Sequence, residues 1–327
     1  MGPHTSNRIR VAAIDFLNPA PLMWDFEHEP RNVELAERYQ VHYTQPALCA
    51  DEVIANRADL GLIPIASLTP DLAIVPGCAI ASLDRVRSIQ LVVKLKLESD
   101  GSERLRSDGL EPADRALAAV RTVAADTASR SSLAYAQILF RRFIGTDPEF
   151  LAAPADPVAM LVEADAALLI GDPALLALEA RDRIEAHSGV GPCVWLDLAH
   201  EWRIRTGLPW VAAVWAIRPG ALAASGIEAA QPGVTRAQPD VRAQLGVTRA
   251  QLIEDLLSSR DHGLAHIEQL VAEWTPRIDL PPDTIRNYLG GNIHYTLDPS
   301  CIAAIEIFRR YAAEADILPA LPNLRFL

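Results

Sequence analysis

The chain has 327 residues, of which half are hydrophobic and 22% are charged, a composition typical of a folded globular protein rather than a disordered one. Its 30 Lys+Arg against 42 Asp+Glu give a formal charge of −12, which argues against a nucleic-acid partner because phosphate binding requires a basic surface. A small anionic ligand is not excluded, since exposed charges are screened beyond about 8 Å at physiological salt.

The N-terminal segment alternates between strand-like and helix-like patterns. The expected order is a strand over 8–16, a helix around Leu22, a strand over 41–43, a helix over 46–58 and a strand over 59–63. Such an alternation predicts an α/β fold with a mostly parallel sheet that helices cover on both faces.

The alternation stops once and then begins again. A β run over 88–93 precedes a polar stretch, 98–115, that we interpret as a surface loop. Further strands are expected over 120–125, 150–152, 166–170, 193–196 and 210–217, with a helix over 131–144. The strand over 210–217 is predicted to return to the first unit.

Beyond residue 217 the sequence predicts helices, over 248–259, 264–274, 283–288 and 302–315. One α/β unit nested within another predicts two lobes, each a mostly parallel sheet with helices, and a ligand cleft between them. Lobe 1 comprises 7–95 and 215–327, and lobe 2 comprises 96–214. Residues 233–238 recur as 246–251, and this single duplication within 233–251 is too short to indicate a repeat fold.

The cysteines and the apolar segments exclude several classes. The four cysteines lie far apart, without a C-x-x-C pair, so we expect buried reduced thiols rather than disulfides or a zinc site. The longest apolar run is much shorter than the roughly 20 residues that cross a membrane. We therefore expect a cytoplasmic chain with no membrane partner, whose helical tail is a candidate homodimer face.

The common catalytic templates are absent from the sequence. There is no H-E-x-x-H, G-x-S-x-G, Walker loop or G-x-G-x-x-G after a strand, and the eight histidines are scattered. The sequence therefore predicts no metal and no cofactor, and no ordinary hydrolase.

Polar residues at strand ends are the remaining candidates. Asn18 ends the first strand and offers amide donors and an acceptor, although it would also suit a helix N-cap. Ser88 begins the strand that crosses between lobes, or is simply an edge-strand serine. Asp172 follows another strand and either caps a helix or faces the ligand, and Trp210 either lines the cleft or belongs to the core.

A run of hydroxyl residues opens one predicted helix. Four of the six residues 127–132 are Ser or Thr, and hydroxyls with free N–H groups at a helix start form an anion site. An ordinary cap by one serine is the alternative, but it needs fewer hydroxyls, so we favour the anion site.

Seven motifs, taken in order, resemble the menaquinone biosynthesis family of the futalosine route, in particular its chorismate dehydratases. They are Phe16-Leu17-Asn18 with Pro21-Leu22, the segment 59–67, Arg87-Ser88, the segments 126–132 and 170–175, Asp197-Leu198 with Trp202, and the segment 206–209 with Trp215. The resemblance covers about residues 8–220, and the helical tail matches more loosely. One departure is Trp210, where the family usually has Phe.

The resemblance implies a two-lobed, periplasmic-binding-protein-like (type II) fold and the dehydration of chorismate, a dianion, to 3-[(1-carboxyvinyl)oxy]benzoate. With it we predict catalytic roles for Asn18 and Ser88, and substrate binding by Ser67, Arg87, Ser129, Ser131, Ser132, Asp172 and Trp210.

The motifs contain no histidine or lysine that could act as an evident base. One hypothesis is that the enolpyruvyl carboxylate of the substrate takes the C3 proton, and Asp172 or Asp15 is the competing base. Two other functions stay open: a non-catalytic small-anion-binding protein, and the sister synthase that forms dihydroxynaphthoate, which is expected to use a catalytic histidine.

Overall fold

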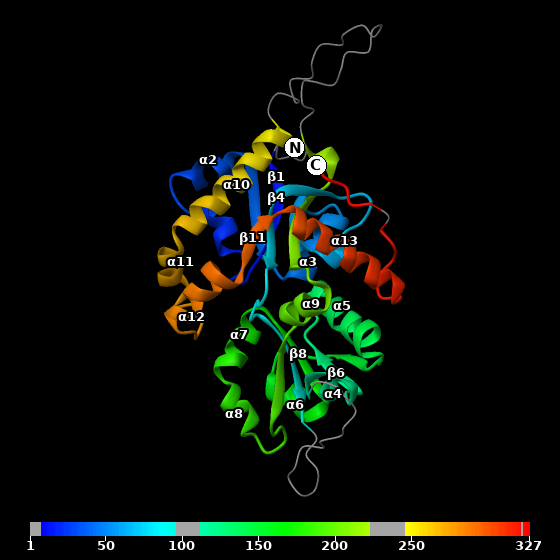
Figure 1. Ribbon diagram of the computed structural model, residues 1–327. Coiled ribbons are helices and arrows are strands. Elements are labelled where there is room, and N and C mark those ends of the chain that lie inside the picture. Colours follow the sequence, from blue (N-terminus) through cyan, green and yellow to red (C-terminus); the bar gives the residue numbers. More distant parts are fainter. Residues whose placement is uncertain (1–7, 96–111, 223–245, 322) are drawn as a thin grey trace, which may run out of the picture.

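The computed structural model describes residues 8–95, 112–222, 246–321 and 323–327. It has two lobes, each with one β-sheet between helices (Figure 1). The first sheet has the order β11-β4-β10-β3-β1-β2, with β1 (Ile9–Ile14), β2 (Tyr39–Thr44), β3 (Leu60–Pro64), β4 (Ala73–Ser82), β10 (Trp210–Ile217) and β11 (His294–Leu297). The second has the order β7-β6-β8-β5-β9, with β5 (Ile89–Lys94), β6 (Thr122–Ala125), β7 (Glu149–Ala152), β8 (Ala166–Ile170) and β9 (Cys193–Asp197).

Helices surround both sheets. Those of the first lobe are η1 (Ala20–Met23), α1 (Trp24–Glu27), α2 (Arg31–Arg38), α3 (Pro46–Ile54), η2 (Ile65–Ser67), η4 (Pro219–Ala221), α10 (Arg249–Ala265), α11 (Ile267–Trp274), α12 (Pro282–Asn287), η6 (Tyr288–Asn292) and α13 (Pro299–Glu314). Those of the second lobe are α4 (Pro112–Ala118), α5 (Arg130–Ile138), η3 (Leu139–Ile144), α6 (Pro157–Glu163), α7 (Gly171–Glu179), α8 (Arg181–Glu185) and α9 (Leu198–Thr206).

The two-lobed α/β fold is confirmed, but both sheets are mixed rather than mostly parallel. In the first sheet β1 is parallel to β2 and β3, whereas β10 is antiparallel to β3 and β4. In the second sheet β6 is parallel to β7 and β8, whereas β5 is antiparallel to β8 and β9. Parallel pairing follows from helical crossovers within a lobe, and the strands that carry the chain between lobes arrive in the opposite direction.

The chain crosses between lobes earlier than the sequence predicts. β5 pairs with β8 and β9 in the second sheet, and all of β10 belongs to the first. The crossings therefore lie between Ser82 and Ile89 and just before Trp210, and the expected lobe boundaries at 95/96 and 214/215 need correction. An apolar strand has the same sequence pattern in either lobe, so its sequence does not show which sheet it joins.

One central strand has no clear signal in the sequence. β4 contains Pro76-Gly77, which resembles a turn, and Gly77 has a positive φ of 100°. Its pairing with β10 has register shifts, so the strand tolerates both residues by bulging.

Part of two predicted features lies outside the described residues, namely 98–111 of the polar stretch and 233–245 of the duplication. The described remainder contains a helix start in both cases. Residues 112–115 belong to α4, and in the second repeat copy Thr248 caps α10 by accepting the N–H of Gln251 at 3.2 Å.

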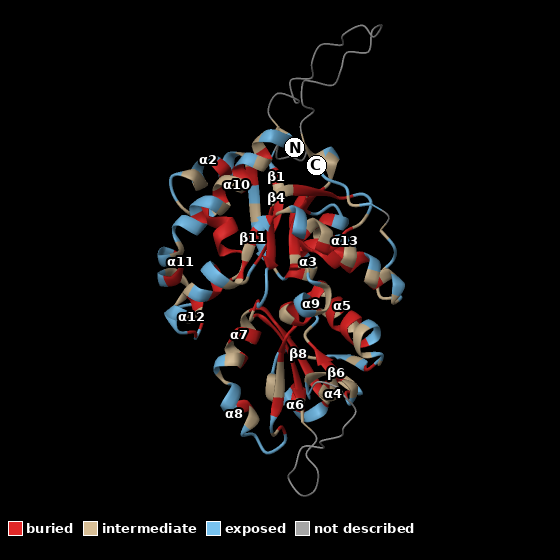
Figure 2. Cartoon of the chain, in the orientation of Figure 1, coloured by how far each residue is buried: buried red, intermediate tan, exposed pale blue. Residues whose placement is uncertain are grey.

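Both sheets are buried at their centres, as Figure 2 shows. Every residue of β3 and of β8 is buried, because helices cover both faces of each strand. All four cysteines are buried and none forms a disulfide, which confirms the expectation of reduced thiols. Within the described part of the chain, no helix combines the length and apolarity needed to span a bilayer.

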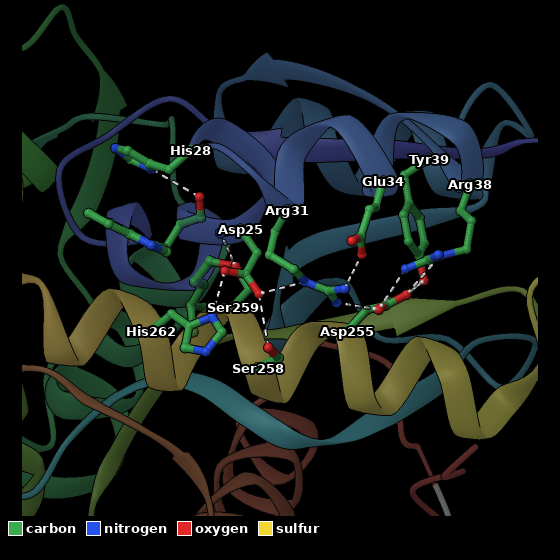
Figure 3. A network of polar contacts seen from close by, with 12 residues as sticks. Asp25, His28, Arg31, Glu34, Arg38, Tyr39, Asp255, Ser258, Ser259 and His262 are labelled. Atoms are coloured by element: carbon green, nitrogen blue, oxygen red, sulfur yellow. Dashed lines mark hydrogen bonds and ion pairs between the residues drawn. The ribbon is translucent and has the colours of Figure 1, made fainter.

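A network of buried charges fixes α10 to the N-terminal helices (Figure 3). Asp25 of α1 and Asp255 of α10 are both buried, and Arg31 lies between them at 3.6 Å and 3.2 Å. Arg38 and the hydroxyl of Tyr39 donate to Asp255 at 2.9 Å. Buried charges need such partners, and these ones hold the segment that follows the first strand end.

Candidate functional site

A cavity that opens to solvent lies between the lobes and is lined by residues of both. Its empty space, including the part that is open to solvent, is about 430 Å³. Four of the lining side chains are a neutral amide or hydroxyls, those of Asn18, Ser88, Ser129 and Ser132, and most of the others are apolar. None of the described lining residues is His, Cys, Lys, Arg, Asp or Glu.

The lobes contact each other around this cavity. The Ala47 N–H at the start of α3 donates to the Ala128 carbonyl at 3.1 Å, and Arg130 forms an ion pair with Asp51 at 2.9 Å. These two contacts join α3 of the first lobe to the start of α5 in the second lobe.

Asn18 is fixed through its backbone, while its side chain is left free. The hydroxyl of Tyr295 donates to the Asn18 carbonyl at 3.0 Å, and the preceding N–H, of Leu17, donates to Asp172 at 3.2 Å. The helix cap after this turn is Pro19, without a side-chain bond, so Asn18 is not an N-cap. Its Oδ1 atom is buried and has no hydrogen-bond partner among the described residues.

Ser88 sits at the crossing between lobes. It lines the cavity, is 2% exposed, and its carbonyl accepts the Gly171 N–H at 2.8 Å. The preceding residue, Arg87, has a φ of +65°, and its N–H donates to Asp197 at 2.7 Å. Because that carboxylate also caps α9, the crossing segment is held in a single conformation just before Ser88.

The side chain of Arg87 does not line the cavity. It pairs instead with Glu179 at 3.6 Å, about two-fifths exposed. Its neighbour Ser88 lines the cavity, so the left-handed backbone at Arg87, just before β5, directs the two side chains to different places. The structure therefore gives no support for direct substrate binding by Arg87.

The hydroxyl cluster at the start of α5 has divided roles. Ser129 is the N-cap of α5 and also lines the cavity with Ser132, whose hydroxyl donates to Ser129 at 3.0 Å. Ser131 points elsewhere: it donates to the Ala212 carbonyl at 2.8 Å and accepts the Ala66 N–H at 3.3 Å. The start of α5 is therefore both capped by a serine and directed toward the cavity. Ser131 joins the lobes instead of facing a ligand.

Trp210 lines the cavity and also belongs to the core, at 1% exposed. Its indole N–H has no partner among the described residues. Ser67 is buried in η2 with an equally unpartnered hydroxyl, but it does not line the cavity, which Pro64 reaches instead.

The two acidic candidates lie outside the cavity lining. Asp172 stands in the first turn of α7 and joins the lobes through the Leu17 N–H. Burial raises the pKa of Asp172 to about 6, against the lowering effect of that N–H, and the charge of Asp15 adds to the rise. Asp15 itself is exposed and lines a neighbouring groove with Glu27 and Tyr43.

We expect the Asp172→Asn variant to change how stability depends on pH. A carboxyl whose pKa is raised on folding stabilises the fold most below its unfolded pKa of about 4, and this contribution is lost as pH rises through about 6. Asparagine keeps the acceptor for Leu17 but cannot ionise. Urea unfolding should therefore show a variant that gains stability relative to the wild type between pH 4 and pH 7, and parallel pH profiles would contradict this.

Two features of the site are missing from the sequence-based prediction. Gly171 has a φ of +60°, and a Cβ there would lie 2.9 Å from the Phe16 ring, so only glycine allows this contact between lobes. Tyr288, from the C-terminal part of the chain, is fully buried, and burial raises the pKa of its phenol against the lowering effect of Ser88 and Asn18. The glycine of the segment 170–175 was a usable signal, and the loose resemblance of the tail at Tyr288-Leu289 was a weaker one.

One group of described residues has metal-ligand chemistry. Atoms of His294, Asp298 and Cys301 lie within 4.8 Å of one another. Asp298 caps α13 through the Cys301 N–H at 2.8 Å and pairs with His294 at 2.9 Å, which accounts for the cluster as a helix start. None of the three lines the cavity.

Two lobes joined at a crossing, with a cavity between them, define the class of periplasmic-binding-protein-like folds. Solved structures of this class match nearly the whole chain. Protein AF1704 from Archaeoglobus fulgidus matches with a TM-score of 0.64 at 15% identity, covering 96% of this chain and 100% of its own. The periplasmic aliphatic sulphonate binding protein SsuA from Escherichia coli matches with a TM-score of 0.59 at 14% identity, covering 96% of this chain and 89% of its own. The alkanesulfonate-binding SsuA from Xanthomonas axonopodis pv. citri, bound to MOPS, matches with a TM-score of 0.57 at 14% identity, covering 96% of this chain and 94% of its own.

At such identities these structures show the fold alone. The family is shown by the sequence: the model of the menaquinone biosynthesis family matches residues 9–314. The chain belongs to that family.

Proposed function

We propose that this chain removes water from chorismate to give 3-[(1-carboxyvinyl)oxy]benzoate. The observation that carries the proposal is the cavity lining, which combines an amide and several hydroxyls with no ionisable side chain among the described residues. Such a lining suits a reaction whose base is supplied by the substrate. It suits the sister synthase less, because that reaction is expected to need a histidine.

The chemistry of the substrate supports this choice. The C3–H bond of chorismate is vinylogous to the ring carboxylate, so its electrons can spread into that carboxylate when the proton leaves. The same electrons then return through the ring and expel the C4 hydroxyl, and the ring becomes aromatic. One hydrogen from C3 and one OH from C4 leave as a single water, with no oxidant or reductant. The protein must hold two carboxylates and stabilise the charge that develops on one of them.

The cavity side chains can share these tasks. We assign Asn18 and Ser88 to the enolpyruvyl carboxylate, which they orient toward the C3 proton. Ser129 and Ser132, at the start of α5, hold the ring carboxylate, where a helix N-terminus favours negative charge. Ser88, Ser129 and Ser132 are positioned by the contacts described above, so these donors need little reorganisation as charge develops.

The proposal is tested by incubating the purified protein with chorismate, with and without a metal chelator. We expect the absorbance of chorismate to fall in both samples and the enolpyruvyl-benzoate to appear by mass spectrometry. Binding of chorismate without product would favour a non-catalytic anion-binding protein. Conversion of the cyclic futalosine derivative, with chorismate untouched, would favour the sister synthase.

Asp172 remains the competing base, because its raised pKa suits proton abstraction near neutral pH. The Asp172→Asn variant distinguishes the two routes. Retained turnover supports the substrate-assisted route, whereas lost turnover with intact chorismate binding assigns the proton transfer to Asp172.

A further inference from the structure

The cavity between the lobes adjoins a second hollow, an open groove that is also lined by residues of both lobes. On three segments of the chain, a residue that lines the cavity is followed or preceded within two positions by one that lines the groove: Pro46 and Gln45, Ser129 and Ala128, and Gly171 and Pro173. Phe16 lines both hollows. The groove is therefore the outward continuation of the cavity, and Phe16 stands at the boundary between them.

The ring of Phe16 reaches from the first lobe to the second at this boundary. A Cβ at Gly171 would lie 2.9, 3.0 and 3.3 Å from three atoms of the ring, so the ring lies against the backbone of Gly171 at the start of α7. The next residue of each segment is joined as well, because the Leu17 N–H donates to Asp172 at 3.2 Å. These two contacts between consecutive residues hold the ring across the gap between the lobes.

The chemistry of the ring defines what it can do there. A phenyl ring has no hydrogen-bonding group, so it acts on a ligand through apolar contact and through the volume that it occupies. Phe16 is half-buried, which agrees with a side chain that borders a cavity on one side and an open groove on the other. It therefore forms the wall that ends the cavity at the groove.

We propose that Phe16 is a specificity-determining residue, whose ring limits the size of the group that a carboxylate ligand can carry at the groove end of the cavity. That the ligands are aryl dicarboxylates related to chorismate rests on the function proposed above. Asn18, which is assigned to the enolpyruvyl carboxylate, lies two residues after Phe16 and lines the same cavity. The proposal thus places the enolpyruvyl end of the ligand against the ring.

The groove beyond the ring can receive a larger apolar group. Much of its lining consists of small or apolar side chains from the segment after β7, namely Ala152, Ala153, Pro154 and Ala155. Removal of the ring joins this space to the cavity. A ligand that is too large for the wild type should then fit, because the discrimination comes from a steric clash rather than from a missing attraction.

Two ligands of equal charge test the proposal. The short one is 3-(carboxymethoxy)benzoate, and the large one is 3-[carboxy(phenyl)methoxy]benzoate, which has the same two carboxylates at the same spacing and one added phenyl group. Calorimetry gives the Kd of each ligand for the wild type and for the variants. The ratio of the two Kd values is the readout, since a general loss of folded protein or of affinity leaves this ratio unchanged.

We expect the wild type to bind the short ligand about tenfold or more tightly than the large one, the usual scale of discrimination by an apolar pocket. In Phe16→Ala the short ligand should lose about tenfold in affinity with the lost ring contact, and the large one should gain about as much, so that the preference is reversed. Phe16→Leu keeps a smaller apolar wall, and its ratio should lie between those of the other two proteins.

The matched control is Phe26→Ala. Phe26 of α1 is also half-buried, but its ring packs edge-on against Tyr39 at 5.4 Å and lines neither hollow. This control should lower the unfolding midpoint and leave the ratio of Kd values at the wild-type level.

Each outcome decides for or against the proposal. A ratio within twofold of the wild type in both Phe16 variants overturns it, and so does a wild type that binds the two ligands equally or binds neither. If the preference is reversed as expected but the wild type does not convert chorismate, only the proposed function fails. If chorismate is converted and the ratio does not change, only the role of Phe16 fails.

Discussion

Replacing Ser88 by alanine is expected to lower kcat for chorismate by about 10²- to 10³-fold, the usual loss when one preorganised donor is removed from developing charge. Ser88 is nearly fully buried, lines the cavity and stands where the chain crosses between lobes. Asp197 fixes the segment before Ser88, so the Ser88 hydroxyl is already positioned before the substrate binds. Water cannot easily take its place. Steady-state kinetics of the purified variant measure the effect.

A matched control is available in the same crossing region. Ser82 is a buried serine like Ser88, and its hydroxyl has no partner among the described residues, but it does not line the cavity. Ser82→Ala should keep wild-type kcat and KM. If the two serine variants lose activity equally, the loss comes from the crossing segment as a whole, and the role assigned to Ser88 is wrong.

Asn18→Asp extends this test with almost no change in shape. It places a negative charge beside a dianionic substrate, so we expect KM to rise and kcat to fall together. Unchanged turnover and unchanged chorismate affinity would remove Asn18 from the site.

The largest expected loss of stability is that of Gly263→Ala. Gly263 lies within α10, where alanine would normally stabilise a helix by about 1 kcal/mol. Here a Cβ would lie 2.1 Å from the carbonyl oxygen of Pro21, and 2.5 Å from its Cα, so backbone would have to move. We expect the free energy of unfolding to fall by about 3 kcal/mol or more, the upper end for overpacking.

Urea unfolding of Gly263→Ala beside Gly220→Ala checks this expectation. Among the described residues, nothing beyond its chain neighbours lies within 4 Å of a Cβ at Gly220, so that control should stay close to the wild type. A Gly263→Ala protein as stable as the wild type would show that α10 can shift away from η1. Because η1 follows Asn18 directly, such a shift would also be expected to disturb the cavity.

The family and the two-lobed fold could be predicted from the sequence because their signals are local. Strand and helix periodicity, together with short motifs at strand ends, predicted β1, β3, β8 and β10 close to their observed positions. The same motifs placed Asn18, Ser88, Ser129 and Ser132 in one site, and the structure brings these four side chains to a single cavity.

Other predicted site residues do not line the cavity, because the direction in which a side chain points is not set by the local sequence. Arg87 and Ser131 stand next to lining residues but face Glu179 and Ala212, and periodicity alone does not fix such directions at a turn. Asp172 joins the lobes instead of lining the cavity, through a bond to an N–H 155 residues earlier in the chain. Contacts of that kind leave no local pattern.

The sequence by itself determined the class of fold, the family and the polar residues at the strand ends, since each of these depends on neighbouring residues. Only the tertiary structure decided which strands belong to which lobe and that the described cavity lining has no ionisable side chain. The physical reason is that an interlobe site is built from residues far apart in the chain. Their convergence is set by sheet pairing and close packing, which a single sequence does not record.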